Sequence, residues 1–450
     1  MLDKLLINGT IVTKDGRFSG NIGIEDESIA QILAPGVVPE AKETIDLSGK
    51  FVLPGAMDAH THIEDPGHTD REDFPHATAA GAVGGITAIG IMPTNDPLIM
   101  TTEAYRTNAD CYVGNGHIDY FIHGGLDGQT FPRARELWRE TGITAIKVFM
   151  CFSSPNMGFV DDETLYKTLE LAGEEDALVI AHCENDGIIK LNQKRMLEAG
   201  RTDRLSFNHS RPGFGEIEAI NRVLCFAKQT GARLLIPHVS TADGLLEVRR
   251  WREKGVEVYA ESCPQYFTFT TDDFEKQGPY LKFTPVMHEQ ENQNRMWELI
   301  GKDYVDTIGS DHSPYPPAEK EIGMQDIWKA LNGIPGLEVE LAVFLNAVNA
   351  GRLTLEQVVR MTSYNCARIY RLPKKGTIQV GNDADITVVD MNLEKEYTTK
   401  DIKSKCTWSP YLGRRFKGWP VMTFVRGAMV AKDGDVVGKK GLGKLLDRAK

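Results

Sequence analysis

The stretch Leu53-Pro54-Gly55-Ala56-Met57-Asp58-Ala59-His60-Thr61-His62 turns at its proline and glycine, then enters a short apolar segment that ends in two histidines. A turn followed by an apolar run is typical of a β-strand. Residues i and i+2 of a strand lie on the same side, so His60 and His62 can bind one ion together. Imidazole is a good ligand for zinc and similar divalent metals. The stretch therefore predicts a strand that carries part of a metal site.

Four later segments contain residues with compatible ligand chemistry. Each is a short apolar run followed by polar or turn residues, as expected for a parallel strand that is buried on both faces. An ammonium group cannot bind a metal, so a lysine in such a run must be deprotonated or modified, for example as a carbamate formed with carbon dioxide. The candidate ligands are Lys147 in 143–150, His182 in 177–182, His238 in 233–238 and Asp311 in 304–311.

Three further runs are also short and largely apolar, but they contain no candidate ligand. They span 85–93, 118–124 and 256–261, and with the five runs above they give eight predicted strands. Helix-like stretches such as 216–228 and 243–254 lie between them. Eight strands that alternate with helices are typical of a (β/α)8 TIM barrel of the α/β class, which does its chemistry at the C-terminal strand ends.

The two ends of the chain predict a second, smaller domain. At 450 residues the chain is long enough for a barrel and such a domain. We predict that residues 1–53 and 373–450 form one small β-sandwich and that residues 54–372 form the barrel. The basic end, residues 438–450, is expected to be solvated or to contact another subunit. Strand-like segments lie at 5–12, 20–29, 376–381, 384–390 and 421–430.

Six motifs resemble those of the amidohydrolase superfamily, and within it the cyclic amidohydrolases: hydantoinases, allantoinases, dihydropyrimidinases and dihydroorotases. The resemblance covers essentially the whole chain. The motifs are Asp58-Ala59-His60-Thr61-His62, Lys147-Val148-Phe149-Met150, Ala181-His182-Cys183-Glu184-Asn185, Pro237-His238-Val239-Ser240, Glu261-Ser262-Cys263-Pro264-Gln265-Tyr266 and Ser310-Asp311-His312-Ser313-Pro314.

The resemblance implies a site for two divalent metal ions, with zinc as the expected metal and manganese or cobalt as alternatives. The implied ligands are His60, His62 and Asp311 for the more buried ion, His182 and His238 for the other, and Lys147, carboxylated to N6-carboxylysine, as the bridge between them.

A reaction follows from this metal chemistry. A water molecule between two divalent ions loses a proton near neutral pH, and the resulting hydroxide would attack the carbonyl carbon of a cyclic amide. Asp311 is the predicted catalytic residue, because it would take the proton from the water and give it to the leaving nitrogen. The ring would open to an N-carbamoyl or ureido acid.

Departures from family patterns narrow the choice of ring. Dihydroorotases typically carry an arginine two residues after the second histidine to hold the substrate carboxylate, whereas this chain has Glu64 there. Dihydropyrimidinases and D-type hydantoinases usually place a tyrosine five residues after the bridging lysine, where this chain has Phe152. Segment 64–69 resembles allantoinases and segment 263–282 resembles L-type hydantoinases. These features favour a five-membered ureide ring of the hydantoin or allantoin type.

Three residues are predicted to contact the substrate. Phe152 belongs to loop 152–159 over the barrel mouth, and Thr284 and Asn332 belong to segments in which the resembling enzymes contact the ring. Apolar side chains in loop 152–159 would suit an aryl or alkyl hydantoin better than the polar ureido arm of allantoin.

Two other classes of function stay open. One is a different cyclic amidohydrolase, such as a dihydropyrimidinase, a dihydroorotase or an enzyme for another imide, lactam or lactone, because its site would look nearly the same. The other is a non-catalytic relative that uses the fold as a scaffold. Such relatives lose metal ligands, whereas all six candidates are present here.

Composition limits the partners and the setting. The net charge of −12 argues against nucleic acid or an anionic membrane as partner, which leaves a small molecule. No apolar run approaches the ~20 residues of a membrane span, and the first residues lack the layout of a signal peptide. The seven cysteines show neither zinc-knuckle nor disulfide spacing. We therefore expect a cytoplasmic protein, and the resemblance implies a homotetramer.

Overall fold

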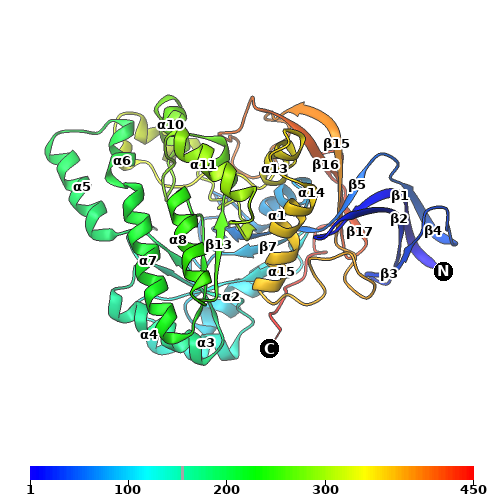
Figure 1. The fold of residues 1–450 in the computed structure, drawn as a ribbon, viewed down its shortest axis with the longest axis horizontal. Helices are drawn as coiled ribbons and strands as arrows, with labels where there is room; N and C mark the ends of the chain where they lie inside the picture. The colour runs from blue at the N-terminus through cyan, green and yellow to red at the C-terminus, as the bar shows by residue number, and fades with distance from the viewer. Residues whose placement is uncertain (154–156, 450) are drawn as a thin grey trace.

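The computed structural model describes residues 1–153 and 157–449, and within them the expected barrel is confirmed (Figure 1). Its parallel strands form two sheets, in the orders β6-β7-β8 and β9-β10-β11-β12-β13-β14. Each of the eight predicted runs contributes a strand position, because β8 and β9 share the third. The strands are β6 (Ala56–Thr61), β7 (Ile86–Ile91), β8 (Asp119–Ile122), β9 (Gly124–Gly125), β10 (Ile146–Phe149), β11 (Leu178–His182), β12 (Arg233–Ile236), β13 (Val258–Ser262) and β14 (Thr307–Ile308).

The third strand position joins the two sheets at His123. Its backbone N–H donates to the carbonyl of Ile91 in β7, and the next N–H, that of Gly124, donates to Ala145 beside β10. The buried imidazole contacts both sheets: its Nε2 donates to the carbonyl of Ala59 in β6 at 2.9 Å, and its Nδ1 lies 3.0 Å from the hydroxyl of Thr144 before β10. This crossover makes the two sheets continuous on one side of the barrel.

The barrel closes on the other side at a short seam between β6 and the segment after β14. Thr61 and His312 pair there, and the backbone N–H of His62 donates to the carbonyl of His312 at 2.7 Å. The buried carboxylate of Asp58 accepts bonds from the backbone N–H of Ser310, at 3.1 Å, and from the Ser310 hydroxyl. The seam therefore sets the two-histidine stretch beside the strand end that carries Asp311.

Helices cover the outside of the barrel, and in Figure 1 most of them lie away from the terminal sheet. Several begin at a side chain that accepts from the first turn, as Asp161 does from Thr164 and Thr241 from Gly244. The helices are α1 (Phe74–Val83), α2 (Thr102–Tyr112), α3 (Ala134–Glu140), α4 (Asp162–Glu174), α5 (Asp186–Glu198), α6 (Arg204–Ser210), α7 (Gly213–Thr230), α8 (Ala242–Glu253), α9 (Pro264–Thr268), α10 (Thr271–Gln277), α11 (Gln290–Ile300), α12 (Pro317–Glu321), α13 (Glu340–Asn349), α14 (Leu355–Val359) and α15 (Asn365–Ile369).

The expected domain from both chain ends is confirmed as one hydrogen-bonded sheet, which has nine strands among the described residues. β5 pairs with β1 and with β15, so the two ends of the chain meet inside the sheet. The exact boundaries between this domain and the barrel stay a prediction. Its strands are β1 (Leu2–Val12), β2 (Arg17–Glu25), β3 (Ser28–Leu33), β4 (Ala41–Asp46), β5 (Phe51–Pro54), β15 (Ile386–Glu396), β16 (Arg415–Val425), β17 (Ala428–Lys432) and β18 (Asp435–Val436).

One expectation for the C-terminal part is wrong. Residues 376–381 are turns and irregular chain rather than a strand, because Gly376 and Gly381 take left-handed backbone angles, with φ of 78° and 90°. The basic end, which was expected to be solvated or to contact another subunit, is half-buried or exposed up to residue 449, and contact with another subunit stays a prediction. It lies on its own barrel, where the backbone N–H of Lys444 donates to Asp119 and that of Leu446 to the carbonyl of Tyr120.

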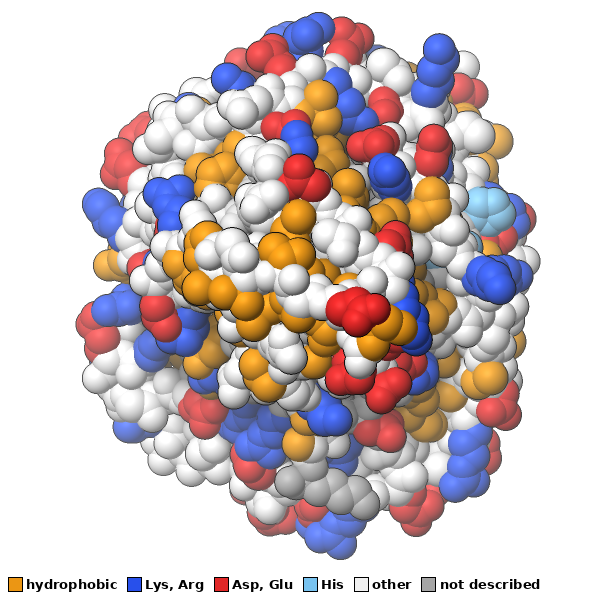
Figure 2. Space-filling view, turned by 90° about the vertical axis from the view of Figure 1, so that its right-hand side faces the viewer, with side chains coloured by type: hydrophobic (Ala, Val, Ile, Leu, Met, Phe, Trp, Pro, Cys, Tyr) orange, Lys and Arg blue, Asp and Glu red, His pale blue; other side chains and the backbone are white. Residues whose placement is uncertain are grey.

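Figure 2 views the molecule from the side of the terminal sheet. Hydrophobic side chains gather near the centre of this face, and acidic and basic side chains are interspersed around them. Among the described residues, no helix combines the length and the apolar character that crossing a membrane requires.

A buried ionic network fastens the terminal sheet to the barrel. The ammonium group of Lys375 contacts Asp119 at the start of β8 at 2.7 Å, Asp383 at 2.9 Å and Asp385 before β15 at 2.5 Å. Arg426 also pairs with Asp119. Since the Lys375 side chain is 2% exposed, its charge is balanced almost entirely by these carboxylates.

We expect Lys375→Met to lower the free energy of unfolding by about 3–5 kcal/mol, because it leaves buried carboxylates without their counter-charge. The adjacent, exposed Lys374→Met is the matched control and should change stability by less than about 0.5 kcal/mol. Chemical denaturation of both variants measures the difference. Equal midpoints and slopes would show that the network contributes nothing to stability.

Candidate metal centre

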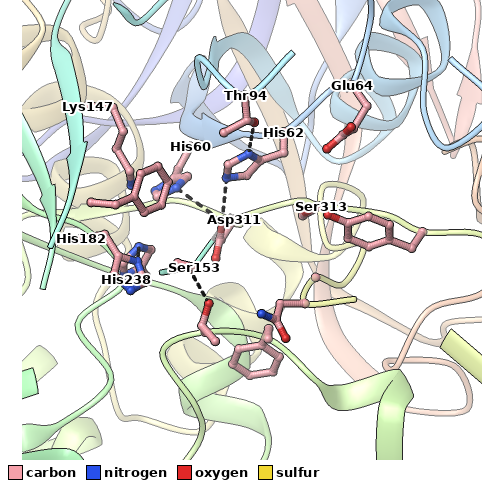
Figure 3. Close-up of a pocket in the computed structure, with 16 residues that line it drawn as sticks. His60, His62, Glu64, Thr94, Lys147, Ser153, His182, His238, Asp311 and Ser313 are labelled. Carbon is pink, nitrogen blue, oxygen red and sulfur yellow. Dashed lines mark hydrogen bonds and ion pairs between the residues drawn. The ribbon is translucent and has the colours of Figure 1, made fainter. Parts of the chain in front are cut away.

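The C-terminal ends of the barrel strands border a polar cavity (Figure 3). The cavity opens to solvent at its mouth. All six predicted metal ligands line it. The lining residues are His60, His62, Glu64, Thr94, Lys147, Phe149, Ser153, His182, His238, Phe283, Thr284, Asp311, Ser313, Tyr315, Asn332 and Gly333.

His60, His62 and Asp311 form one group of ligand atoms, all within 4.8 Å of one another. Nε2 of each histidine lies 3.3 Å from Oδ1 of Asp311. Two atoms bound to one tetrahedral zinc at about 2.0–2.2 Å lie roughly 3.3–3.6 Å apart. Nε2 of His60 is also buried without a hydrogen-bond partner among the described residues. The three side chains therefore fit one divalent ion.

His182 and His238 project into the same cavity as Lys147 (Figure 3). Nδ1 of His182 lies 3.1 Å from Nε2 of His238, which is also close to the spacing of two ligands on one ion. The Lys147 side chain is 1% exposed, and its Nζ finds no hydrogen-bond partner in the part of the chain that the structure describes. A buried polar atom without a partner is costly. These three residues fit a second ion if Lys147 carries an anionic group.

Buried acceptors orient the two histidines of the first group. Oε1 of Glu261 lies 2.7 Å from Nδ1 of His60, and the hydroxyl oxygen of Thr94 lies 2.7 Å from Nδ1 of His62. When Nδ1 carries the proton and donates it to these oxygens, Nε2 keeps its lone pair for a metal. Both Nε2 atoms face Asp311, so the acceptors direct the lone pairs toward the same point.

Glu184 orients the imidazole ring of His182. Its Oε2 lies 2.8 Å from Nε2 of His182 and accepts a bond from Arg211 at 2.6 Å. Burial alone would raise the pKa of Glu184, but Arg211 and His182 hold that pKa below its ordinary value. An ionised Glu184 favours the proton on Nε2 and leaves Nδ1 free to face His238. Cys151, His182 and Glu184 also lie within 4.8 Å, but Glu184 is already paired there.

Burial sets the protonation of the ligands. It lowers the pKa of His60, His182 and His238 below the ordinary value, so these imidazoles are neutral at pH 7 and able to bind metal. Burial also lowers the pKa of Lys147 to about 8, against the attraction of nearby carboxylates. An appreciable fraction of this amine is therefore unprotonated near neutral pH, which is the nucleophilic form.

Three residues around the cavity take left-handed backbone angles that are unfavourable for side chains other than glycine. The φ angles are 61° at Glu64, 40° at His238 and 52° at Asp311. Such strain persists where surrounding bonds fix the chain. After His238, the buried carboxylate of Glu216 accepts the backbone N–H groups of residues 240 and 241 at 2.9 and 3.0 Å. The strain is concentrated where ligands must be aimed.

Of the three residues predicted to contact the substrate, two line the cavity and one does not. Thr284 and Asn332 line the cavity, whereas Phe152 does not, and its side chain is 57% exposed. Its neighbour Ser153 lines the cavity instead, with a hydroxyl 2.8 Å from that of Thr284. The sequence offered no pattern that singled out Ser153. The structure thus supplies a hydroxyl next to the position where the family tyrosine is missing.

The apolar wall expected from loop 152–159 is mostly turned away from the cavity. Residues 154–156 of this loop lie outside the described residues. Met157 is buried and packs with Met100 and Phe149, and Phe159 lies under the ammonium group of Lys190. The phenylalanine and tyrosine rings that line the cavity among the described residues are those of Phe149, Phe283 and Tyr315, and none of them belongs to loop 152–159.

A buried lysine holds the loop that carries Asn332. The ammonium group of Lys320 donates to three backbone carbonyls, those of Lys282 at 3.1 Å, Leu331 at 2.8 Å and Gly333 at 2.8 Å. Its side chain is completely buried. Because the acceptors lie on either side of Asn332 and close to Thr284 in sequence, this clasp fixes two segments of the cavity wall.

Comparison with known proteins agrees with the site. The Amidohydrolase family model matches residues 51–430. The chain belongs to the amidohydrolase family. It is 36% identical to L-hydantoinase of Paenarthrobacter aurescens, over 100% of this chain and 98% of that protein, and 35% identical to allantoinase of Rubrobacter xylanophilus, over 96% and 95%. It is also 35% identical to D-hydantoinase of Geobacillus stearothermophilus, over 100% and 97%.

Solved structures of this family extend the agreement to the fold. That of L-hydantoinase from Arthrobacter aurescens superposes with a TM-score of 0.97 at 36% identity and covers 100% of both chains. That of dihydropyrimidinase from Brevibacillus agri gives 0.93 at 32% identity, over 99% and 98%. The expectation of a cyclic amidohydrolase, a hydrolase of carbon–nitrogen bonds in cyclic amides, is confirmed at the level of the enzyme class.

We expect Lys147→Ala to lose bound metal and activity together, because a carboxylated Lys147 would be the anion that joins the two ligand groups. Metal content measured by emission spectrometry after gentle purification with zinc and bicarbonate tests this. Added acetate or propionate should restore part of both. Lys167→Ala, at an exposed lysine of α4, is the control and should keep both ions. Two bound ions and full activity in Lys147→Ala would contradict the bridging role.

Proposed function

We propose that this chain is a metal-dependent hydrolase that opens the ring amide of a five-membered cyclic ureide, of the hydantoin or allantoin type, to an N-carbamoyl or ureido acid. The observation that carries the proposal is the convergence of four histidines, Lys147 and Asp311 on one cavity. Similarity to a hydantoinase and an allantoinase over nearly the whole chain supports a cyclic ureide as the class of substrate.

Two divalent ions would be held by these residues, with zinc as the proposed metal. His60, His62 and Asp311 would hold one ion and His182 and His238 the other, and Lys147 would join them as N6-carboxylysine. The neutral amine attacks the carbon of carbon dioxide and loses one proton, which leaves an anionic carbamate. Bound ions supply Lewis acidity, which polarises an amide carbonyl and makes hydroxide available at neutral pH.

Asp311 is proposed to move the proton. Its carboxylate oxygen Oδ1 lies against both Nε2 atoms of the first group, and its side chain is 12% exposed to the cavity mouth. From this position the carboxylate takes a proton from the attacking water and gives it to the ring nitrogen as the carbon–nitrogen bond breaks. Glu261 and Glu184 contact His60 and His182 from behind and are not part of the cavity lining, so Asp311 is the carboxylate of the ligand cluster that faces the cavity.

The ring is proposed to sit between the metal ligands and the loop held by Lys320. The hydroxyls of Ser153 and Thr284 offer donors or acceptors to the ring carbonyl and nitrogen groups, in place of the missing tyrosine hydroxyl. Asn332 and Gly333 border the same space. Phe152 is proposed to act at the mouth, where its exposed ring can meet a substituent.

We expect Asp311→Asn to lower kcat by about 100-fold or more, the usual loss when a general acid–base group is removed. Most of the bound metal should remain, because the histidines and Lys147 are untouched. Steady-state kinetics and metal analysis of the same preparation separate the two effects. Asp303→Asn, at an exposed aspartate before β14, is the control. Unchanged turnover in Asp311→Asn would remove Asp311 from proton transfer.

The choice of ring is tested by direct hydrolysis. Enzyme loaded with zinc or manganese plus bicarbonate is offered allantoin, 5-benzylhydantoin, dihydrouracil and dihydroorotate, and opened products are identified by mass. We expect the two five-membered ureides to open fastest. Faster opening of dihydrouracil would favour the dihydropyrimidinase alternative. Absence of any opened product with two metals bound would show that the proposed ring is wrong.

A further inference from the structure

Glu64 is a charged side chain in the cavity that the proposed reaction does not use. It lies two residues after His62, lines the cavity and is 4% exposed. Its loop is held by the carbonyl of Asp65, which accepts bonds from the Asn95 amide at 2.8 Å and the Tyr112 hydroxyl at 2.6 Å. In Figure 3 the Glu64 carboxylate lies to the right of His62 and above Ser313, on the opposite side of the view from His182 and His238. A fixed carboxylate therefore borders the space beside the reacting centre.

The charge of Glu64 is only partly balanced. Arg71 contacts Oε2 of Glu64 at 3.3 Å, but it also contacts Glu319 at 3.0 Å and lies over the ring of Tyr315. One guanidinium thus serves two carboxylates, and Arg71 itself is not part of the lining. Oε1 of Glu64 accepts no hydrogen bond from any described residue. The carboxylate keeps acceptor capacity for a ligand.

Apart from Lys147, the described lining has no lysine or arginine. The two proposed ions would supply positive charge at the reacting centre, and Lys147 loses its own positive charge once it is carboxylated. An anionic substituent that ends beside Glu64 would meet a carboxylate rather than these ions, and burial makes such a like-charge contact costly. A substituent with N–H donors would instead make a charge-assisted hydrogen bond.

We infer that Glu64 is a specificity-determining residue that selects ring substituents ending in N–H donors, either neutral as in a ureido group or cationic as in an ammonium group. The inference rests on the proposed ring-opening function and names its substrate class more closely. It replaces the aryl or alkyl preference drawn from loop 152–159, whose apolar side chains lie mostly outside the cavity.

A panel of hydantoins that differ only at C5 tests this assignment in the metal-loaded enzyme. The substituents are ureido (allantoin), 4-aminobutyl, benzyl and carboxymethyl. We expect kcat/KM for the two N–H-bearing substrates to exceed that for the carboxymethyl compound by at least about tenfold, the worth of one charge-assisted hydrogen bond. Allantoin and the aminobutyl compound distinguish a neutral from a cationic donor as the preferred form.

Two substitutions should move this preference in opposite directions. Glu64→Gln keeps the shape but removes the charge, and should cut the ratio of aminobutyl to benzyl kcat/KM by about tenfold, mainly through KM. Arg71→Met leaves Glu64 without its partner and should raise that ratio. Asp70→Asn removes one charge from an exposed position of the same loop and should leave the ratio unchanged. Misfolding alone cannot produce opposite shifts.

The outcomes separate this inference from the proposed function. If none of the hydantoins opens although two metals are bound, the proposed function fails. If they open but the benzyl or carboxymethyl compound is preferred, or Glu64→Gln leaves all ratios unchanged, the role of Glu64 is overturned and the ring-opening function stands. Opposite shifts in Glu64→Gln and Arg71→Met, with equal metal content, support the inference.

Discussion

The closure of the barrel at the contact of Asp58 with Ser310 is the constraint on which the rest of the site depends. Asp58 accepts the backbone N–H and hydroxyl of Ser310 and also the backbone N–H of His60. One buried carboxylate thereby fixes the histidines of the first strand against the aspartate of the last. Because these residues are about 250 positions apart in the chain, no local structure could assemble the first metal group without this seam.

The barrel and the six residues that meet at its cavity could be predicted from the sequence because their signals are local. Each candidate ligand ends or lies within an apolar run such as Leu178–His182. A strand that is buried on both faces is apolar whichever strands it pairs with, so it can be recognised from its own residues. The partners that aim the ligands were not predicted. Glu184 follows His182 by two residues and Glu261 lies on a predicted strand, so both were visible, but only the folded geometry shows which ring each one contacts.

Sequence patterns did not reveal features that depend on backbone conformation or on contacts between distant parts of the chain. The segment 376–381 has apolar residues at strand spacing, yet its glycines turn the chain so that Lys375 and Asp385 can meet. Charge patterning alone could not show that the basic end lies along its own barrel, because the acceptor of Lys444 is in β8. The cavity wall follows the same logic: Ser153, not Phe152, faces inward, a difference of one position that composition does not encode.

The bonds of Lys320 hold the loop around Asn332 without fixing which side chain that loop presents to the cavity. These three bonds go to main-chain oxygens, so they do not depend on which side chains the clasped residues carry. At Gly333 the freedom is lost, since a Cβ atom would lie 2.3 Å from the carbonyl oxygen of Ser313. At position 332 a different side chain can enter the cavity while the loop keeps its path. A fold arranged this way can diversify its choice of ring by point substitution, with the catalytic framework inherited intact.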